Sequence, residues 1–209
     1  MSRRQTGRLC VLSAPSGSGK STVKDRLLSR RLNLVYSVSF TTRLPRPGEI
    51  DGYDYHFVTK ERFSDMIRAG EFLEWAEVFG NFYGTSRLEV SGHLQAGQNV
   101  LADLDVKGGA SVRACMPEAV LVFMVPPTAV ELRRRLSDRR TESAADLDRR
   151  LAKARVEIER SRIYDFLLIN DQLEEAVDGL EEIIFQGRGR PMAEAAAFWR
   201  KFFGEERPG

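Results

Sequence analysis

Cysteine and histidine are scarce in this sequence, and their scarcity argues against several classes of protein. The 209 residues include two cysteines, Cys10 and Cys115, which lie too far apart to indicate a metal-ligand spacing or a disulfide framework. The two histidines, His56 and His93, have no matching cluster of acids or cysteines nearby, so we expect each to be structural or solvated. The cysteine usage fits a reducing cytoplasm.

Long apolar runs and a strong charge imbalance are also absent. No stretch reaches the about 18 consecutive apolar residues of a membrane-spanning helix, and no apolar segment of signal-peptide length follows the basic N-terminus. The 32 basic and 30 acidic residues leave a net charge of +2, which argues against a general nucleic-acid-binding protein. We therefore expect a soluble, cytoplasmic protein without nucleic-acid or membrane partners.

The apolar periodicity predicts an α/β fold with a central parallel sheet. A chain of this length with 42% hydrophobic residues can form one core of typical size with inserted subdomains. Short apolar runs alternate with helical patterns, as in βαβ units. The strands predicted for the core are 9–12, 35–40, 99–105, 120–125 and 165–170. The predicted helices are 21–31, 61–69, 88–96, 109–114, 173–185 and 192–203, with two more between 131 and 162. Further short strands, at 53–58, 72–79 and 82–83, predict a small β-rich insert within residues 39–86.

The stretch that joins the first strand to the first helix is typical of a phosphate-binding loop. It reads Ser-Ala-Pro-Ser-Gly-Ser-Gly-Lys-Ser-Thr over residues 13–22. Gly17 and Gly19 let the backbone fold tightly with its N–H groups inward, and the helix N-terminus adds a positive field. Lys20 is placed to bind the β- and γ-phosphates of a nucleoside triphosphate, and the Ser21 hydroxyl is placed to ligate Mg²⁺. Ala14 stands where the consensus G-x-x-x-x-G-K-[ST] has its first glycine.

The segment between Glu131 and Arg162 is strongly charged, with ten arginines from Arg133 onward. One interpretation is a pair of solvated helices whose alternating charges keep the surface soluble. The other is a cationic lid that closes over phosphates. The segment alone does not decide between them.

The rest of the chain favours a small-molecule kinase over a GTPase switch. A switch needs a guanine-reading N-K-x-D segment late in the chain, and Asn170-Asp171 lacks the lysine. A kinase needs a second pocket for the acceptor and mobile cations for the transferred group. The insert and the arginine-rich segment can supply them.

Four motifs in order give the chain a close resemblance to the guanylate kinase family, the P-loop enzymes that transfer the γ-phosphoryl group of ATP to GMP. The resemblance extends from about residue 7 to 186. It rests on the phosphate loop at 13–22, on Thr-Thr-Arg-Leu-Pro-Arg-Pro-Gly-Glu at 41–49, on Phe-Leu-Glu-Trp-Ala-Glu-Val-Phe-Gly-Asn-Phe-Tyr-Gly-Thr at 72–85 and on Leu-Asp-Val-Lys-Gly-Gly at 104–109.

The resemblance implies three functional regions and a tail. The implied regions are a P-loop NTPase core (1–38, 98–128 and 163–187), a GMP-binding insert with its connecting helix (39–97) and a helical lid (129–162). The tail, residues 188–209, carries no family motif. Its four aromatic residues between Phe198 and Phe203 would form an exposed apolar patch if unpaired, so we expect it to pack on the core or on a second subunit of a homo-oligomer.

The resemblance also implies a role for individual residues. ATP is expected on Ala14, Pro15, Ser16, Gly17, Ser18, Gly19, Lys20, Ser21 and Thr22, with Asn170 at its adenosine end. The GMP phosphate is expected on Ser39, Arg43, Arg46, Tyr55 and Tyr83, because guanidiniums and hydroxyls suit a dianion. Glu74 and Thr85 would read the guanine base, Asp105 would line the same pocket, and Asp103 would lie near Mg²⁺ and its waters. The lid arginines that would clamp the phosphates with Lys20 are Arg135, Arg139 and Arg150. The lid turn reads Asp138-Arg139-Arg140 where the family usually has Gly-Arg-Gly, which puts its hinge flexibility in doubt.

Two alternatives remain at this point. A related kinase could act on a phosphorylated sugar such as ribose 1,5-bisphosphate, but Glu74 and Thr85 speak against it. A non-catalytic scaffold could use the insert to bind peptides, but Lys20 and Ser21 are intact. No general base is required in a kinase of this type, because a phosphate monoester is already an anionic nucleophile.

Overall fold

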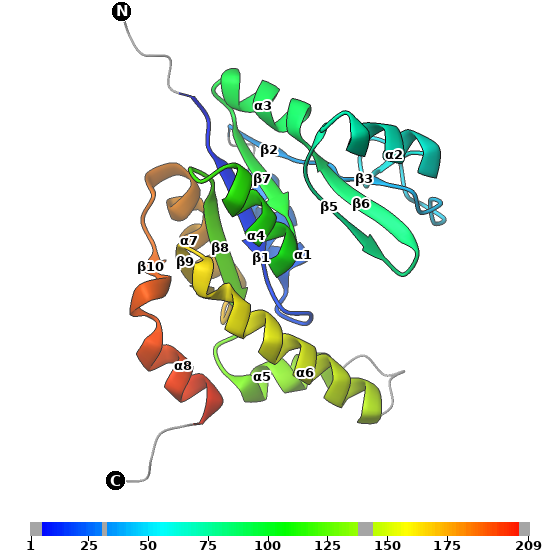
Figure 1. Ribbon diagram of the computed structural model, residues 1–209. Helices are drawn as coiled ribbons and strands as arrows, with labels where there is room; N and C mark the ends of the chain where they lie inside the picture. Colours follow the sequence, from blue (N-terminus) through cyan, green and yellow to red (C-terminus); the bar gives the residue numbers. More distant parts are fainter. Residues whose placement is uncertain (1–5, 31–32, 138–143, 205–209) are drawn as a thin grey trace, which may run out of the picture. The chain divides into compact units, whose positions relative to one another are not determined.

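The computed structural model describes residues 6–30, 33–137 and 144–204 (Figure 1). These residues form two compact units. The first comprises the described residues of Met1–Val11 and Leu32–Ala119, and the second comprises those of Leu12–Arg31 and Val120–Gly209. No helix in the described part of the chain is both long and apolar enough to cross a membrane.

The larger of two sheets has the strand order β10-β9-β8-β1-β7-β2. Its strands are β1 (Leu9–Ser13), β2 (Leu34–Tyr36), β7 (Asn99–Asp103), β8 (Val120–Val125), β9 (Phe166–Ile169) and β10 (Arg190–Pro191). In the first unit β2 runs parallel to β7, and in the second β8 runs parallel to β9. Strand β10 pairs antiparallel with β9. All residues of β1 and nearly all of β8 are buried, as expected for strands covered on both faces. The predicted α/β fold with a mainly parallel central sheet is therefore confirmed.

The smaller sheet lies entirely within the first unit and has the order β4-β3-β6-β5. Its strands are β3 (Phe40–Thr41), β4 (His56–Phe57), β5 (Phe72–Val78) and β6 (Asn81–Ser86). Helix α2 (Lys60–Arg68) lies beside these strands (Figure 1) and buries Phe63 and Met66 against Phe72. The Thr59 hydroxyl accepts from the Arg62 N–H at 3.2 Å and so caps the start of α2. The β-rich segment falls within the predicted insert.

The other helices follow the predicted alternation. They are α1 (Lys20–Leu28), α3 (Arg87–Gln95), α4 (Val106–Cys115), α5 (Ala129–Ser137), α6 (Ala144–Arg160), α7 (Leu173–Gln186) and α8 (Ala196–Phe203), with short 3-10 helices at Ser161–Ile163 (η1) and Met192–Glu194 (η2). In the second unit, Arg26 of α1 pairs with Glu174 of α7 at 2.8 Å. The side chain of Arg30, just after α1, pairs with Glu181 at 2.7 Å.

Several element boundaries differ from the sequence prediction: the helix expected over 192–203, for example, is the short η2 followed by α8. Three further differences have a clear cause. The strand expected over 35–40 is two strands, because β2 ends at Tyr36 and β3 begins at Phe40 in the other sheet. The strand expected over 53–58 is reduced to β4, because the Asp54 carboxylate accepts from the Ile50 N–H at 2.8 Å and holds the preceding residues in a turn. Helix α4 begins at Val106 instead of Gly109, since Asp105 caps it.

Candidate functional site

The loop between β1 and α1 has the backbone shape of an anion-binding site. It follows Ser13, and α1 starts at Lys20. Gly17 and Gly19 each have a φ of 84°, in the left-handed region that suits glycine. Among the described residues no side chain caps α1, whose N-cap is Gly19, and the N-terminus of this helix adds a positive field to the loop.

Space as well as conformation requires these two glycines. A Cβ on Gly17 would lie 2.9 Å from Leu136 Cδ2, and one on Gly19 would lie 2.6 Å from Asn170 Nδ2. By contrast Ala14 has no positive φ, since Phe79 is the one non-glycine residue of the described ranges with such an angle. The departure from the consensus at Ala14 is therefore compatible with the loop.

Two buried side chains hold the loop, and both belong to the second unit, as the loop itself does. The Asn170 amide donates from Nδ2 to the Ser18 carbonyl at 2.7 Å, and the Tyr164 hydroxyl donates to Ser13 Oγ at 2.6 Å. Asn170, expected at the adenosine end of ATP, thus holds the loop backbone with its amide nitrogen. Within the described chain the buried Ser18 hydroxyl has no hydrogen-bond partner. Tyr164 carries no sequence signal that links it to the loop.

Two of the predicted lid arginines reach the phosphate loop. Arg150 on α6 donates from Nη2 to Ser16 Oγ at 2.7 Å. Arg135 on α5 lies beside Gly19, because a Cβ built on that glycine would be 4.0 Å from Arg135 Nη1. The third, Arg139, lies outside the described residues.

Glu131 holds Arg135 in place. Its Oε1 accepts from Arg135 Nε at 2.6 Å, and the same carboxylate accepts from Arg134 at 2.7 and 2.8 Å. The hydrogen bonds from Arg134 and then Arg135 lower the pKa of Glu131 to about 2, so this acid stays ionised. Glu131 was not predicted, although its spacing of four residues from Arg135 on a helix is a usable signal.

The first turn of α1 carries Lys20, Ser21 and Thr22, with Lys20 half-buried and the two hydroxyls exposed. No group of three or more His, Cys, Asp or Glu side chains in the described ranges could hold a metal ion. The chemistry of the Ser21 hydroxyl suits Mg²⁺, which is usually bound through substrate phosphates and water with one or two protein oxygens. Asp103, the other predicted Mg²⁺ neighbour, is the last residue of β7 in the first unit.

In the first unit, Glu74 and Thr85 form a polar pair across the β5–β6 ladder. They are opposite each other in register, and the buried Thr85 hydroxyl donates to Glu74 Oε1 at 2.6 Å. Burial raises the pKa of Glu74 above the ordinary carboxyl value, although the Thr85 hydrogen bond partly opposes the effect. A half-enclosed carboxylate next to a hydroxyl is suited to a ligand that presents two N–H donors.

The start of α4 makes room for the Glu74 carboxylate. A Cβ on Gly108 would lie 3.2 Å from Glu74 Oε2, so any larger side chain would press on this oxygen. The Asp105 side chain accepts from the Lys107 and Gly108 N–H groups at 3.0 and 2.8 Å. Its negative charge contributes to the raised pKa of Glu74, which places Asp105 close to the predicted base pocket.

Arg43 is held by an acid that the sequence analysis did not assign. Its guanidinium donates from Nη1 and Nη2 to Glu49 at 2.9 and 2.8 Å, and its Nη1 also donates to the Leu44 carbonyl at 2.8 Å. The same carboxylate accepts from the Arg46 N–H at 2.7 Å. These bonds, that of Arg43 first, lower the pKa of Glu49. Glu49 closes the motif at 41–49, which is the signal that could have identified it.

Two of the other predicted phosphate ligands, Tyr55 and Tyr83, lie beside Arg43. Its guanidinium lies 5.3 Å from the centre of the Tyr55 ring, and the Tyr55 and Tyr83 rings meet edge to face at 5.9 Å. Burial raises the pKa of Tyr55, to which the nearby charge of Asp103 contributes, so the hydroxyl keeps its proton and can donate. Ser39 precedes β3, and its carbonyl accepts from the N–H of His56 at 2.9 Å. The side chain of Arg46 is exposed. The side chains of Arg43, Tyr55 and Tyr83 therefore gather around one point of the insert.

Both histidines have structural partners. His56 stacks on Phe40 with ring centres 4.5 Å apart and lies 3.5 Å from Glu89. The Nδ1 atom of His93 lies 2.9 Å from Gln98 Oε1. Both therefore pack and bond as expected for structural residues.

The chain is similar to guanylate kinases over most of its length. The family model described as guanylate kinase matches residues 6–187. A protein named guanylate kinase from Dechloromonas aromatica is 48% identical over 178 residues, covering 85% of this chain and 88% of that protein. One from Neisseria gonorrhoeae is 47% identical over 184 residues, covering 88% and 90%. The crystal structure of guanylate kinase from Anaplasma phagocytophilum has a TM-score of 0.70 at 34% identity, covering 94% of both chains.

Proposed function

We infer that this chain, which belongs to the guanylate kinase family and phosphorylates GMP with ATP, transfers the γ-phosphoryl group by in-line displacement with charge neutralisation by arginines and Mg²⁺. The observation that carries this mechanism is the position of Arg135 and Arg150 at the phosphate loop. Each arginine comes from a different helix of the predicted lid segment.

At the ATP end, the loop backbone and Lys20 bind the β- and γ-phosphates. The uncapped N-terminus of α1 supplies N–H donors, and the left-handed glycines let the backbone approach the anion. Ser21 would hold Mg²⁺, which when bound neutralises charge on the phosphate oxygens, and Asp103 stays a predicted neighbour of the metal. Asn170 keeps the loop in shape through the Ser18 carbonyl.

The arginines act on the charge that develops on the transferred group. Glu131 orients Arg135 through its Nε, and the terminal nitrogens of Arg135 can bind phosphate oxygens. Arg150 donates to Ser16, and a phosphate oxygen can take the place of that hydroxyl. Arginine is suited to this role because its planar fork can bind two oxygens at once.

At the acceptor end, Glu74 accepts from the N1–H and N2–H₂ of guanine. Thr85 has one hydroxyl proton, and in this structure it is donated to Glu74. We propose that guanine takes over this acceptor and that the Thr85 hydroxyl turns to donate to O6. Thr85 thus stands in for one guanine donor until GMP arrives.

The GMP phosphate binds where Arg43, Tyr55 and Tyr83 meet, with Ser39 and Arg46 beside them. Glu49 fixes the Arg43 fork before the substrate arrives, so less side-chain entropy is lost on binding. The phosphate is itself the nucleophile, and alignment with charge neutralisation carries the catalysis.

The mechanism is tested by removing the two arginines singly. Arg135→Ala and Arg150→Ala should each lower kcat by about 10²-fold or more, as for other groups that stabilise transition-state charge. Arg133→Ala and Arg160→Ala are matched controls, because these exposed arginines lie on the same two helices and form no ion pair within the described ranges. Steady-state kinetics with saturating ATP and GMP measure the effect. Equal kcat values for the four variants would exclude the arginine role.

The acceptor is tested separately with an assay of ADP release across GMP, AMP, CMP, UMP and ribose 1,5-bisphosphate. GMP should be the preferred acceptor by a wide margin. Preference for the sugar phosphate would instead support the related sugar kinase, and absence of turnover with every acceptor would support a scaffold.

A further inference from the structure

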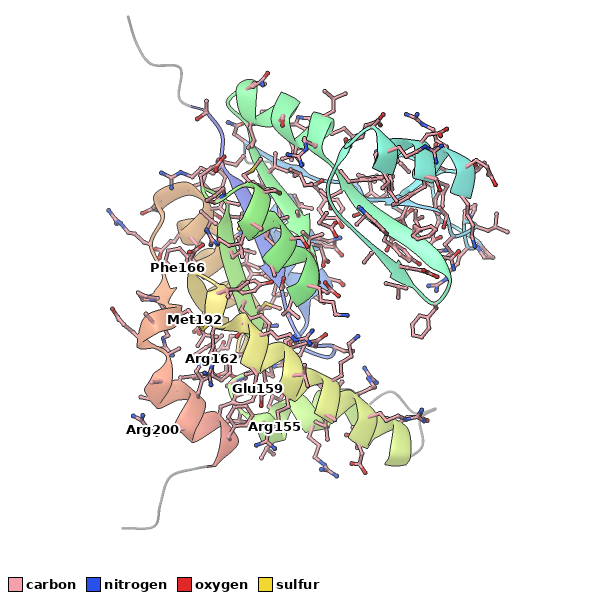
Figure 2. All side chains as sticks on the ribbon, in the orientation of Figure 1. Arg155, Glu159, Arg162, Phe166, Met192 and Arg200 are labelled. Carbon is pink, nitrogen blue, oxygen red and sulfur yellow. The ribbon has the colours of Figure 1, made fainter. Side chains whose placement is uncertain are left out.

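A large cavity in the second unit is separate from the residues assigned to ATP and GMP. Its volume is about 820 Å³, and it is lined by side chains of α6, of η1 and of the tail. Figure 2 shows Arg155, Glu159 and Arg162 on the α6 and η1 side and Met192 and Arg200 on the tail side. None of the residues predicted to bind substrate lines it. The volume lies within the range of about 300 to 1,000 Å³ that is typical of small-molecule sites.

The inner walls of this cavity are apolar and aromatic. Ile158 and Met192 are buried, whereas Trp199 and Phe203 are only half-buried and leave part of their rings accessible. These two rings stack at 6.2 Å with an angle of 28° between their planes. Arg155 lies over the Phe203 ring at 5.4 Å. A flat ring could therefore pack against Trp199 and Phe203.

The rim of the cavity is basic, and its charges are poorly compensated. Arg162 and Arg200 make no hydrogen bond or ion pair with any residue of the described ranges, and both are exposed. One acid of the lining, Asp165, accepts from the Leu121 N–H at 2.8 Å, which uses part of its acceptor capacity. The other, Glu159, makes no ion pair with these arginines within the described ranges. Two guanidiniums thus remain available to an anionic group.

We propose that this cavity is a binding site for a small aromatic organic anion. The aromatic ring packs on Trp199 and Phe203, and a carboxylate or phosphate group of the ligand pairs with Arg162 and Arg200. This assignment gives the tail a role, because α8 and η2 supply one wall of the site. It does not depend on the proposed kinase mechanism, since the four side chains that would hold the ligand lie outside that machinery, although Tyr164, which contacts the phosphate loop, also lines the cavity.

The chain offers a specific optical test, because it contains two tryptophans, Trp75 and Trp199. In a Trp75→Phe variant, Trp199 becomes the only tryptophan and lies in the cavity wall. The probe is 8-anilinonaphthalene-1-sulfonate, which carries fused aromatic rings and one sulfonate. Energy transfer from Trp199 to this probe is titrated with ADP and GMP present, which fill the substrate sites without turnover. Saturable transfer is expected, and transfer that rises linearly without saturation would overturn the proposal.

The anionic part of the site is tested in the same background. Arg162→Gln combined with Arg200→Gln should raise the dissociation constant of the probe by about tenfold or more, because two charge-assisted contacts are lost. Arg160→Gln combined with Arg188→Gln is the matched control, since both arginines are exposed on the same segments but do not line the cavity. Thermal unfolding checks that all variants stay folded. Equal weakening in both double variants would overturn the assignment.

Competition then identifies the acidic group. Unlabelled 1-naphthyl phosphate and 1-naphthoate should displace the probe, and the tighter of the two indicates which anion the site prefers. The neutral 1-naphthalenemethanol should be at least about tenfold weaker than the better anion, because it cannot pair with the arginines. If the neutral alcohol displaced the probe with the same affinity as both anions, binding would depend on apolar contacts alone, and the proposal would be contradicted.

Discussion

The Glu74 carboxylate is partly buried, and its raised pKa predicts a pH dependence of GMP phosphorylation. Burial, and then the charge of Asp105, raise its pKa, while the guanine donors require the ionised form. As the pH falls, Glu74 should therefore become protonated earlier than an ordinary carboxylate. We expect kcat/KM for GMP to decrease on acidification from above the usual carboxyl range, with kcat/KM for ATP less affected.

The phosphate of GMP also titrates near neutral pH and contributes to the same profile. The control is therefore a variant that lacks the Glu74 carboxylate but still binds the titrating phosphate. Glu74→Gln removes the carboxylate alone, and its pH profile for GMP should lack the Glu74 limb. Superimposable normalised profiles of the wild type and Glu74→Gln would contradict the role of this acid. The profiles are measured as kcat/KM at subsaturating GMP.

Thr85 gives a second prediction at the scale of a single residue. Its hydroxyl is buried and donates to Glu74, so Thr85→Val leaves that carboxylate oxygen without its partner and removes a donor to guanine. We expect KM for GMP to rise by about tenfold or more in Thr85→Val. Thr85→Ser keeps the hydroxyl and should stay within a few-fold of the wild type. If serine and valine raised KM equally, packing rather than hydrogen bonding would explain the position.

Among the elements, the phosphate loop depends on the conformation of one glycine. Gly19→Ala forces a left-handed φ on a residue with a Cβ, which costs about 1–2 kcal/mol, and sets that Cβ against the Asn170 amide. It should lower kcat/KM for ATP by about tenfold or more and reduce the free energy of unfolding in urea. Ala14→Gly, at a position without a positive φ, should leave kcat/KM for ATP within about twofold. A reversed order of the two variants would contradict this account of the loop.

Local signals in the sequence predicted most elements but not where the chain changes sheets. The glycines and the lysine at 17–20 predict the phosphate loop, and apolar runs predict β1 and β8. By contrast, residues 35–40 alternate like one strand. In the structure they contribute to two strands, because β2 pairs with β7 in the larger sheet and β3 pairs with β6 in the smaller one. The sequence prediction begins helix α4 at Gly109, because Gly108 and Gly109 disfavour a helix. In the structure the Asp105 cap overrides that propensity, and the helix begins at Val106.

At the scale of the whole molecule, the predicted site residues fall into two sets, one in each compact unit. The loop, Asn170, Arg135 and Arg150 belong to the second unit, and the predicted GMP ligands belong to the first. What sequence reasoning missed are the partners that orient these residues. Tyr164 acts through a contact that depends on the folded chain, since it lies 151 positions from Ser13. Glu49 and Glu131 lie near their arginines in the sequence, so a local signal for them was available. The division into core, insert and lid stays a prediction, and Arg139 with the lid turn lies outside the described residues.

The central claim is that Glu74 makes this chain a kinase for GMP. Adenine has no N1–H and carries an amino donor at C6, so opposite Glu74 and Thr85 it would leave polar groups unpaired at about 1–3 kcal/mol each. The decisive measurement is kcat/KM for GMP and for AMP in the wild type, in Glu74→Gln and in Glu77→Gln, an exposed acid on the same strand that serves as the control. We predict a preference for GMP of about a hundredfold or more in the wild type and in Glu77→Gln, and its loss through a raised KM for GMP in Glu74→Gln. Equal use of AMP and GMP by the wild type, or unchanged GMP kinetics in Glu74→Gln, would contradict the account.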